Sequence, residues 1–375
     1  MVKRIENEYY PDYVSPPGET LLELLDALYM TQVELAQRIG KSPKHINEIV
    51  KGSAPITAET ALDLERAVGV PSSFWNNRER QYREALARRV ETDLLRNCLD
   101  WMDNLPLKEM LQYGWLSAVE DPVDQLREVL RFFGVAGPDE WNAIWLRPDA
   151  AFRQSPVFEA DPYAVAAWMR QGACEAQRLQ CAPWDRGGFE SALASIRGLT
   201  RLPPARFQEE LACLCANAGV AVVFVPALSR TRASGVTRWL APDKAMIQLS
   251  LRYKSDDHLW FTFFHEAGHL LRHGKREVFI HTVDGDNQEK EGEADRFAAD
   301  CLIPSKFWRR FARRRRDFHR ADILDFADEM GIAAGIVVGR LQHEGRLGYN
   351  RHNDLKRRLD WQLLPDAGGV AIALE

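Results

Sequence analysis

The sequence predicts a mainly helical α+β protein that contains one small β-sheet. Three observations predict this fold class. The first 80 residues repeat short apolar helical patterns, separated by capping residues and glycines. Residues 220–251 contain short β-branched runs separated by turn residues, which is typical of strands. Residues 261–274 then return to a helical pattern that is apolar on most sides, as in a buried helix.

The chain has 375 residues, which predicts two or three domains. We expect a first domain at residues 15–80, a helical middle region at 81–200, a second domain at 201–355 and a C-terminal tail at 356–375. Hydrophobic residues make up 46% and charged residues 27%, as in ordinary globular proteins with a substantial core. Because the net charge is −5, any nucleic-acid site must be a local patch.

Several absences favour a cytoplasmic protein without a membrane partner. The N-terminus MVKRIENEYYPDYV lacks the apolar run of a signal peptide, and no apolar stretch is long enough to cross a bilayer. The six cysteines are scattered, and none forms C-x-x-C. Reduced thiols are therefore a better interpretation than a disulfide framework or a cysteine metal site.

The first domain contains two short helical segments joined by a tight turn. Thr31 is placed to cap the first of them, with Glu34 at the third helical position, and Gly40 ends it. Ser42-Pro43 starts the second as N-cap and first helical residue, and this helix continues to Val50. Two helices in this arrangement are typical of a helix-turn-helix.

In that geometry the second helix enters the DNA major groove with its first residues near base edges. The side chains placed to read bases are Ser42, Lys44, His45 and Asn47. Those placed to contact phosphates are Thr31, Gln32, Lys41 and Lys51. A plain helical bundle with a polar surface would give nearly the same pattern, so the pattern alone leaves both interpretations open.

Residues 17–77 resemble the Xre-type helix-turn-helix of HigA-type antitoxins. The matching skeleton is TQ-ELA--IG followed by I-EIV-G---IT--TAL-L----G----FW. The resemblance implies binding to a double-stranded DNA operator, usually as a homodimer. Phe74 and Trp75 are either contacts between two such copies or part of the domain's own core.

The middle region, residues 81–200, shows a charged helical stretch at 81–103 and then helical patterns interrupted by proline and glycine. Six tryptophans are spread along residues 101–184, a spacing more typical of a core than of a ligand site. We expect a helical connector between two domains.

In the second domain, a helical segment with the sequence ARFQEELACLCANAG precedes three short strands, at Val220–Val225, Gly235–Leu240 and Ala245–Leu251. A helix with the motif H-E-x-x-H follows. His265 and His269 lie one turn apart on one helix face, where they can bind one Zn²⁺ ion, and Glu266 is placed to take a proton from a water molecule that the metal activates. An extended peptide substrate can add to an exposed edge of such a sheet.

An acidic helical segment at residues 289–299 can complete this site. Glu291 can bind the metal while Asp295, one turn later, accepts the free N–H of a ligand histidine. Glu293 is the rival ligand, and Glu289 is a weaker candidate. Such acids usually just solvate the start of a helix. The buried histidine pair makes a metal site the better interpretation, since unpartnered imidazoles are costly in a core.

The segments FTFFHEAGHLLRHG and EGEADRFAADCLIP resemble the ImmA/IrrE family of metallopeptidases, over roughly residues 200–350. The resemblance implies a gluzincin-like zinc peptidase domain with Glu291 as the third ligand. The residue that stabilises the oxyanion is left open; the candidates by chemistry alone are His258, His273, His281, His319, His343, Tyr253 and Tyr349.

We therefore predict a DNA-binding transcriptional regulator or antitoxin that carries a zinc-dependent endopeptidase domain, with Glu266 as the catalytic residue and one specific protein or toxin as its partner. The alternative is a non-catalytic HigA-like antitoxin, in which the metallopeptidase fold is a structural or toxin-binding module. A third hypothesis is a general protease without regulatory DNA binding.

Overall fold

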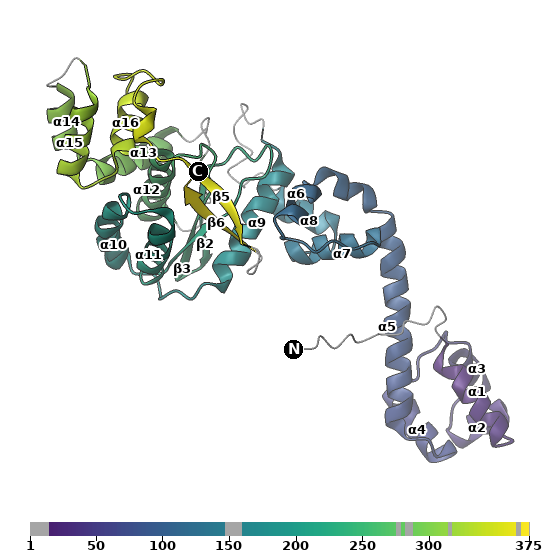
Figure 1. Cartoon of the computed structure of the whole chain (residues 1–375). Coiled ribbons are helices and arrows are strands. Elements are labelled where there is room, and N and C mark those ends of the chain that lie inside the picture. Colours follow the sequence, from purple (N-terminus) through teal and green to yellow (C-terminus); the bar gives the residue numbers. More distant parts are fainter. Residues whose placement is uncertain are drawn as a thin grey trace. The chain divides into compact units, whose positions relative to one another are not determined.

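The protein is described here by a computed structural model (Figure 1), which describes residues 15–146, 160–274, 279–281, 288–313, 317–364 and 369–374. The chain forms two compact units, Met1–Cys98 and Leu99–Glu375. The predicted fold class is confirmed: the described residues are mostly helical, with two small sheets. None of the helices in the described part of the chain combines the length and apolar character that a membrane span requires.

The first unit contains five helices in its described part: α1 (Pro17–Ala27), α2 (Gln32–Arg38), α3 (Pro43–Val50), α4 (Ala58–Val68) and α5 (Ser72–Arg96). Leu21, Leu35, Ile46 and Leu64 are fully buried in one core that joins the helices. The predicted caps are present, since Thr31 accepts from the backbone N–H of Glu34 and Ser42 from that of His45.

Helix α5 runs without interruption across the expected domain boundary at residue 80. Its first turns belong to the first unit, because Trp75 is fully buried there and Arg78 donates to Ser15 at 2.7 Å. No proline or glycine lies between residues 72 and 96, so nothing in the chain ends the helix earlier. The boundary between the units consequently falls after Cys98 rather than after residue 80.

The second unit starts with a 3₁₀ helix, η1 (Leu99–Asn104), and helices that precede the sheet: α6 (Leu107–Gln112), α7 (Pro122–Phe133), α8 (Pro138–Trp145), α9 (Pro162–Arg178), α10 (Arg186–Leu199) and α11 (Pro204–Ala216). The strands of the sheet are β1 (Val220–Phe224), β2 (Gly235–Ala241), β3 (Lys244–Leu249) and β4 (Phe279–His281). The remaining helices are α12 (Asp256–Arg272), α13 (Gln288–Leu302), α14 (Ser305–Arg313), α15 (Arg320–Met330), α16 (Ala334–His343) and the 3₁₀ helix η3 (Asn353–Leu355).

The four-stranded sheet has the order β1-β3-β2-β4. Strand β1 pairs parallel with β3, whereas β2 is antiparallel to both β3 and β4. Alternate residues face opposite sides: Val220 and Val222 join one apolar core with α10–α12, while Ala221 and Val223 join another with α9. The sheet therefore lies between two helical layers, both visible in Figure 1.

The expected middle region does not end in a separate domain at residue 200. Helix α9 packs directly on the sheet, where Trp168 donates its indole N–H to the carbonyl of Val225 at 3.0 Å and Gln248 donates to the carbonyl of Trp168 at 2.8 Å. Gly172 permits this approach, because a Cβ there would lie 1.9 Å from Gln248 Oε1. Helix α9 thus supplies one of the two layers that cover the sheet, and α10, which also precedes residue 200, belongs to the other.

The residues of the expected tail contain a hairpin of β5 (Leu359–Leu364) and β6 (Gly369–Leu374). Gln208 on α11 fixes β6 through both backbone groups of Ile372, at 2.9 and 3.0 Å. Just before the hairpin, Arg357 donates to the buried carboxylate of Asp256 at 3.0 Å. The chain end is therefore tied to α11 and to the start of α12.

Candidate metal centre and DNA-binding helix

Helix α12 holds both histidines of the H-E-x-x-H motif inside the protein. His265 is 0% and His269 1% exposed, and their Nε2 atoms lie 2.9 Å apart. The helix is apolar on nearly every side because Trp260, Phe263 and Leu270 pack into the core around the motif. Two imidazoles that face one point in a buried site make a candidate metal centre.

Helix α13 brings a carboxylate to the same point. Glu291 Oε2 lies 3.1 Å from His265 Nε2, and its Oε1 lies 3.4 Å from His269 Nε2. The two helices approach closely because Gly268 has no side chain: a Cβ there would lie 3.2 Å from the Cα of Ala294. Within the described part of the chain, His265, His269 and Glu291 form the one group that could hold a metal ion.

Each histidine has a second partner at its other ring nitrogen. Asp295 Oδ1 lies 2.9 Å from His265 Nδ1, and His273 Nδ1 lies 3.0 Å from His269 Nδ1. Glu293, the rival ligand, instead lies 3.5 Å from His273 Nε2. Such partners fix the ring orientation of histidines that bind metals.

Glu266 is fully buried beside this group, and neither of its carboxylate oxygens has a hydrogen-bond partner among the described residues. Burial raises the pKa of Glu266 to about 8. Gly235 at the start of β2 makes room for it, because a Cβ there would lie 2.6 Å from Glu266 Oε1. In the sequence, the one sign of this contact is that Gly235 lies inside a predicted strand, where a glycine can mark the close approach of another group.

The two histidines have opposite electrostatic surroundings. Burial lowers the pKa of His265, but hydrogen bonds to Asp295 and Glu291 outweigh it and raise that pKa to about 9. Burial dominates at His269 and lowers its pKa to about 4. Both values describe the site without a cation, where one imidazolium compensates the nearby carboxylate.

The donor set and its spacing fit Zn²⁺. A tetrahedral zinc ion with Zn–N bonds of about 2.0–2.1 Å separates its ligand atoms by about 3.3 Å. The separations between the three ligand atoms, 2.9, 3.1 and 3.4 Å, lie close to that value. Two neutral imidazoles and one carboxylate also leave a fourth position for a reactant, as in catalytic rather than structural zinc sites.

The candidates for oxyanion stabilisation lie in different surroundings. His273 contacts His269 directly, whereas His258 stacks on Tyr253 with ring centroids 4.3 Å apart. The side chain of His281 lies outside the described residues, although its backbone pairs with Gly235. His319, His343 and Tyr349 are exposed elsewhere on the unit.

In the first unit, α3 has one face in the core and another in solvent. Ile46 and Ile49 are buried, while Lys44 and Asn47 are exposed; the Lys44 side chain is 86% exposed and 3.8 Å from Glu48. His45 is partly buried and also faces Glu48 at 3.8 Å. The start of α3 thus exposes Ser42, Lys44 and Asn47 to solvent, while His45 is partly buried.

The predicted phosphate contacts are also accessible, with different local roles. Thr31 caps α2, Gln32 follows it in the first turn, and Lys51 is exposed after α3. Lys41 pairs with Glu59 at 3.4 Å. Of the aromatic pair at 74–75, Trp75 is fully buried in the core and Phe74 is 39% exposed.

Two family models match the chain. A helix-turn-helix model matches residues 15–75, and a model described as an IrrE N-terminal-like domain matches residues 215–342. Among curated proteins, the virulence-associated protein I of Dichelobacter nodosus is 40% identical over 67 residues, which cover 18% of this chain. The match spans 62% of that protein's length.

Solved structures match the N-terminal part as well. An addiction module antidote protein of a HigA family from Coxiella burnetii is 29% identical, with a TM-score of 0.21, and the match covers 22% of this chain and 92% of that one. The Pseudomonas aeruginosa antitoxin HigA with the higBA promoter is 28% identical, with a TM-score of 0.21, and covers 22% and 90%. Because both family models match, the chain contains an Xre-type helix-turn-helix domain at its N-terminus and an IrrE/ImmA-like peptidase-family domain towards its C-terminus.

Proposed function

We propose that the chain is a DNA-binding transcriptional regulator whose IrrE-like domain is a zinc-dependent endopeptidase that cleaves a specific protein. The observation that carries the proposal is the convergence of His265 Nε2, His269 Nε2 and a carboxylate oxygen of Glu291, with Glu266 buried beside them. A buried carboxylate without hydrogen-bond partners lowers the stability of the folded protein. Such groups are typical of functional sites, where the carboxylate has a chemical role.

The residues of the site have separate tasks in this proposal. His265, His269 and Glu291 would hold the zinc ion, and Asp295 and His273 orient the two rings. When bound, zinc supplies Lewis acidity, which polarises a scissile carbonyl and makes a water molecule more acidic. Glu266 takes the proton of the attacking water at a carboxylate oxygen and later gives it to the leaving amine.

The pKa of Glu266 suits this exchange. A general base works best when its pKa is near the working pH, and burial raises the pKa of Glu266 to about 8 without a cation nearby. A bound cation would lower it again and keep the carboxylate ionised at neutral pH. Gly235 has no side chain to displace this carboxylate, since a Cβ there would lie 2.6 Å from Glu266 Oε1.

DNA binding is the second half of the proposal, and it rests on the exposed start of α3. Lys44 and Asn47 can reach base edges there, and Lys51 can contact a phosphate. The Pseudomonas aeruginosa antitoxin HigA, which matches this part of the chain, has been solved with the higBA promoter. We infer an operator near the chain's own gene and a homodimer that reads it, as resemblance to such antitoxins implies.

Affinity capture with the Glu266→Gln protein tests the peptidase half. This variant keeps the metal ligands, so it should retain a substrate that it cannot cut. The captured protein is then incubated with the unmodified chain and with Glu266→Gln. Cleavage by the unmodified chain alone supports the proposal. If neither protein cleaves any captured partner, the non-catalytic alternative replaces it, with the IrrE-like domain as a partner-binding module.

A further inference from the structure

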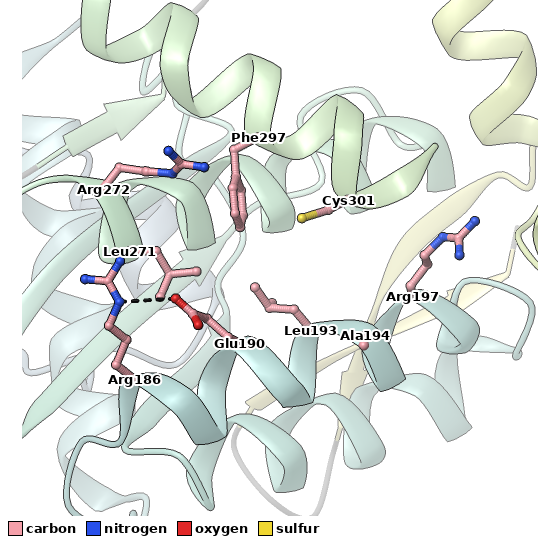
Figure 2. A pocket seen from close by; sticks show the side chains of 9 residues that line it. All are labelled: Arg186, Glu190, Leu193, Ala194, Arg197, Leu271, Arg272, Phe297 and Cys301. Atoms are coloured by element: carbon pink, nitrogen blue, oxygen red, sulfur yellow. Dashed lines mark hydrogen bonds and ion pairs between the residues drawn. The ribbon is translucent and has the colours of Figure 1, made fainter. Parts of the chain in front are cut away.

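The second unit contains a pocket that shares none of the candidate metal-centre residues. It lies between α10, the end of α12 and α13, and has a volume of about 440 Å³. Figure 2 shows the side chains that line it: Arg186, Glu190, Leu193, Ala194, Arg197, Leu271, Arg272, Phe297 and Cys301. Its volume is within the usual range of small-molecule sites, about 300–1,000 Å³.

The pocket is positively charged. Three arginines and one glutamate line it, which gives a formal charge of 3 − 1 = +2. Glu190 pairs with Arg186 at 3.1 Å, whereas no carboxylate of the described residues pairs with Arg197 or Arg272. Arg197 is held in place by a bond of 2.8 Å from its Nε to the carbonyl of Leu302, which leaves its outer nitrogens for other acceptors.

The rest of the lining is apolar and uncharged. Leu193 and Leu271 are about 5% exposed, and Phe297 lies under the guanidinium of Arg272, 5.6 Å from its ring centroid. Burial raises the pKa of the Cys301 thiol to about 11, so it adds no negative charge. Guanidinium groups beside an apolar wall favour a ligand with one anionic end and one apolar end.

We propose that this pocket binds a small organic anion, with its carboxylate or phosphate on Arg272 and Arg186 and its apolar body against Leu193, Leu271 and Phe297. The pocket is close to the seam between the two helices of the metal centre. A Cβ on Gly268 would lie 3.1 Å from the Phe297 ring, and Leu271 follows His269 by two residues. A ligand in the pocket would therefore contact Leu271 of α12 and Phe297 of α13, which lie where these two helices pack together.

Titration calorimetry on the full chain tests this site with three probes: phenyl phosphate, 3-phenylpropionate and the neutral 3-phenylpropanol. We expect at least one anion to bind and the alcohol to bind far more weakly. The two anions distinguish a phosphate from a carboxylate head group. Arg272→Gln and Arg186→Gln should each weaken binding about tenfold or more, because each removes a charge-assisted contact.

Two controls make the result specific. Arg206→Gln removes an arginine of another exposed i,i+4 pair, Arg206–Glu210, outside the pocket, and should leave binding unchanged. His265→Ala removes a candidate metal ligand; if binding is lost in this variant but kept in Arg272→Gln and Arg186→Gln, the anion lies at the metal centre and the proposal is overturned. It is also overturned if neither anion binds, if the alcohol binds equally well, or if the Arg272 and Arg186 variants bind as tightly as the original chain.

Discussion

Oδ1 of Asp295 lies 2.9 Å from Nδ1 of His265, one turn along α13 from the carboxylate that faces the other nitrogen of the same ring. One helix thus supplies both a candidate metal ligand and the group that orients another ligand. This arrangement fixes which nitrogen of His265 faces the metal position, because a neutral imidazole that donates its Nδ1–H to Asp295 leaves Nε2 unprotonated and able to bind a metal.

Replacement of Asp295 by alanine is therefore expected to weaken zinc binding about 10- to 100-fold, the usual cost of losing such a partner. Competition against a chromophoric zinc chelator measures it. Glu289→Ala, an exposed acid two residues before Glu291 on the same helix, is the matched control and should change the affinity little. An unchanged affinity in Asp295→Ala would remove this residue from the site.

Gly235→Ala should damage activity without removing the metal. The new Cβ would lie 2.6 Å from Glu266 Oε1 and 2.7 Å from Thr262 Cγ2, so the carboxylate must move. We expect normal zinc content, slower cleavage of the captured substrate and a lower melting temperature. Gly198→Ala in α10, where a Cβ meets nothing within 4 Å, should instead be neutral or stabilising by about 0.5–1 kcal/mol. Equal activity in both variants would contradict the proposed crowding of Glu266.

Two substitutions in the helix-turn-helix should affect DNA binding differently. Asn47→Ala is expected to lose about 1–3 kcal/mol of discrimination between the operator and altered sequences. Lys51→Ala is expected to weaken binding to all DNA sequences alike. It should also lower the slope of log K against log salt concentration by about 1. Gel-shift titrations at several salt concentrations separate these effects. Arg66→Ala, which removes an exposed arginine paired with Asp63 on α4, is the control. If all three variants bind alike, α3 is not the reading helix.

The buried ion pair between Arg357 and Asp256 should be important for stability. Asp256 is 1% exposed, so Arg357→Ala leaves a buried carboxylate without its positive partner. The free energy of unfolding should fall by about 3–5 kcal/mol. Arg201→Ala breaks the exposed pair with Asp328 and should cost at most about 1 kcal/mol. Chemical denaturation measures both, and similar costs would contradict this account.

The same pair gives a pH dependence. Burial already raises the pKa of Asp256, and Arg357 opposes that shift. In Arg357→Ala the native carboxyl binds its proton more tightly than the unfolded chain, whose pKa is about 3.9. The stability of this variant should therefore fall as the pH rises from about 4 through the native pKa, relative to the unmodified protein.

Local sequence patterns were sufficient to predict many elements. Thr31 and Ser42 begin helices as caps, and the strands near residues 220, 235 and 245 appear where the β-branched runs lie. The i,i+4 spacing of the motif histidines and the next acidic helix also indicated the candidate site. These features depend on residues close together in the chain, which is what periodicity and capping report.

Long-range packing was not predictable in the same way. The bonds of Trp168 to Val225, and of Gln208 to Ile372, join segments 57 and 164 residues apart. They decide that residues 99–200 cover the sheet and that the chain end forms a hairpin. The closeness of Gly235 to Glu266 is of the same kind, because it depends on how β2 lies across α12.

The cleavage rate of the captured protein by the Glu266→Gln variant, measured beside its zinc content, tests the central claim most directly. The account predicts the same zinc content as in the unmodified chain and a rate about 10²- to 10⁴-fold lower, the usual contribution of a general base. Glu210→Gln, in the exposed Arg206–Glu210 pair on α11, is the matched control and should cleave at close to the original rate. Full zinc content with undiminished cleavage in Glu266→Gln would contradict the role of this residue and the mechanism built on it.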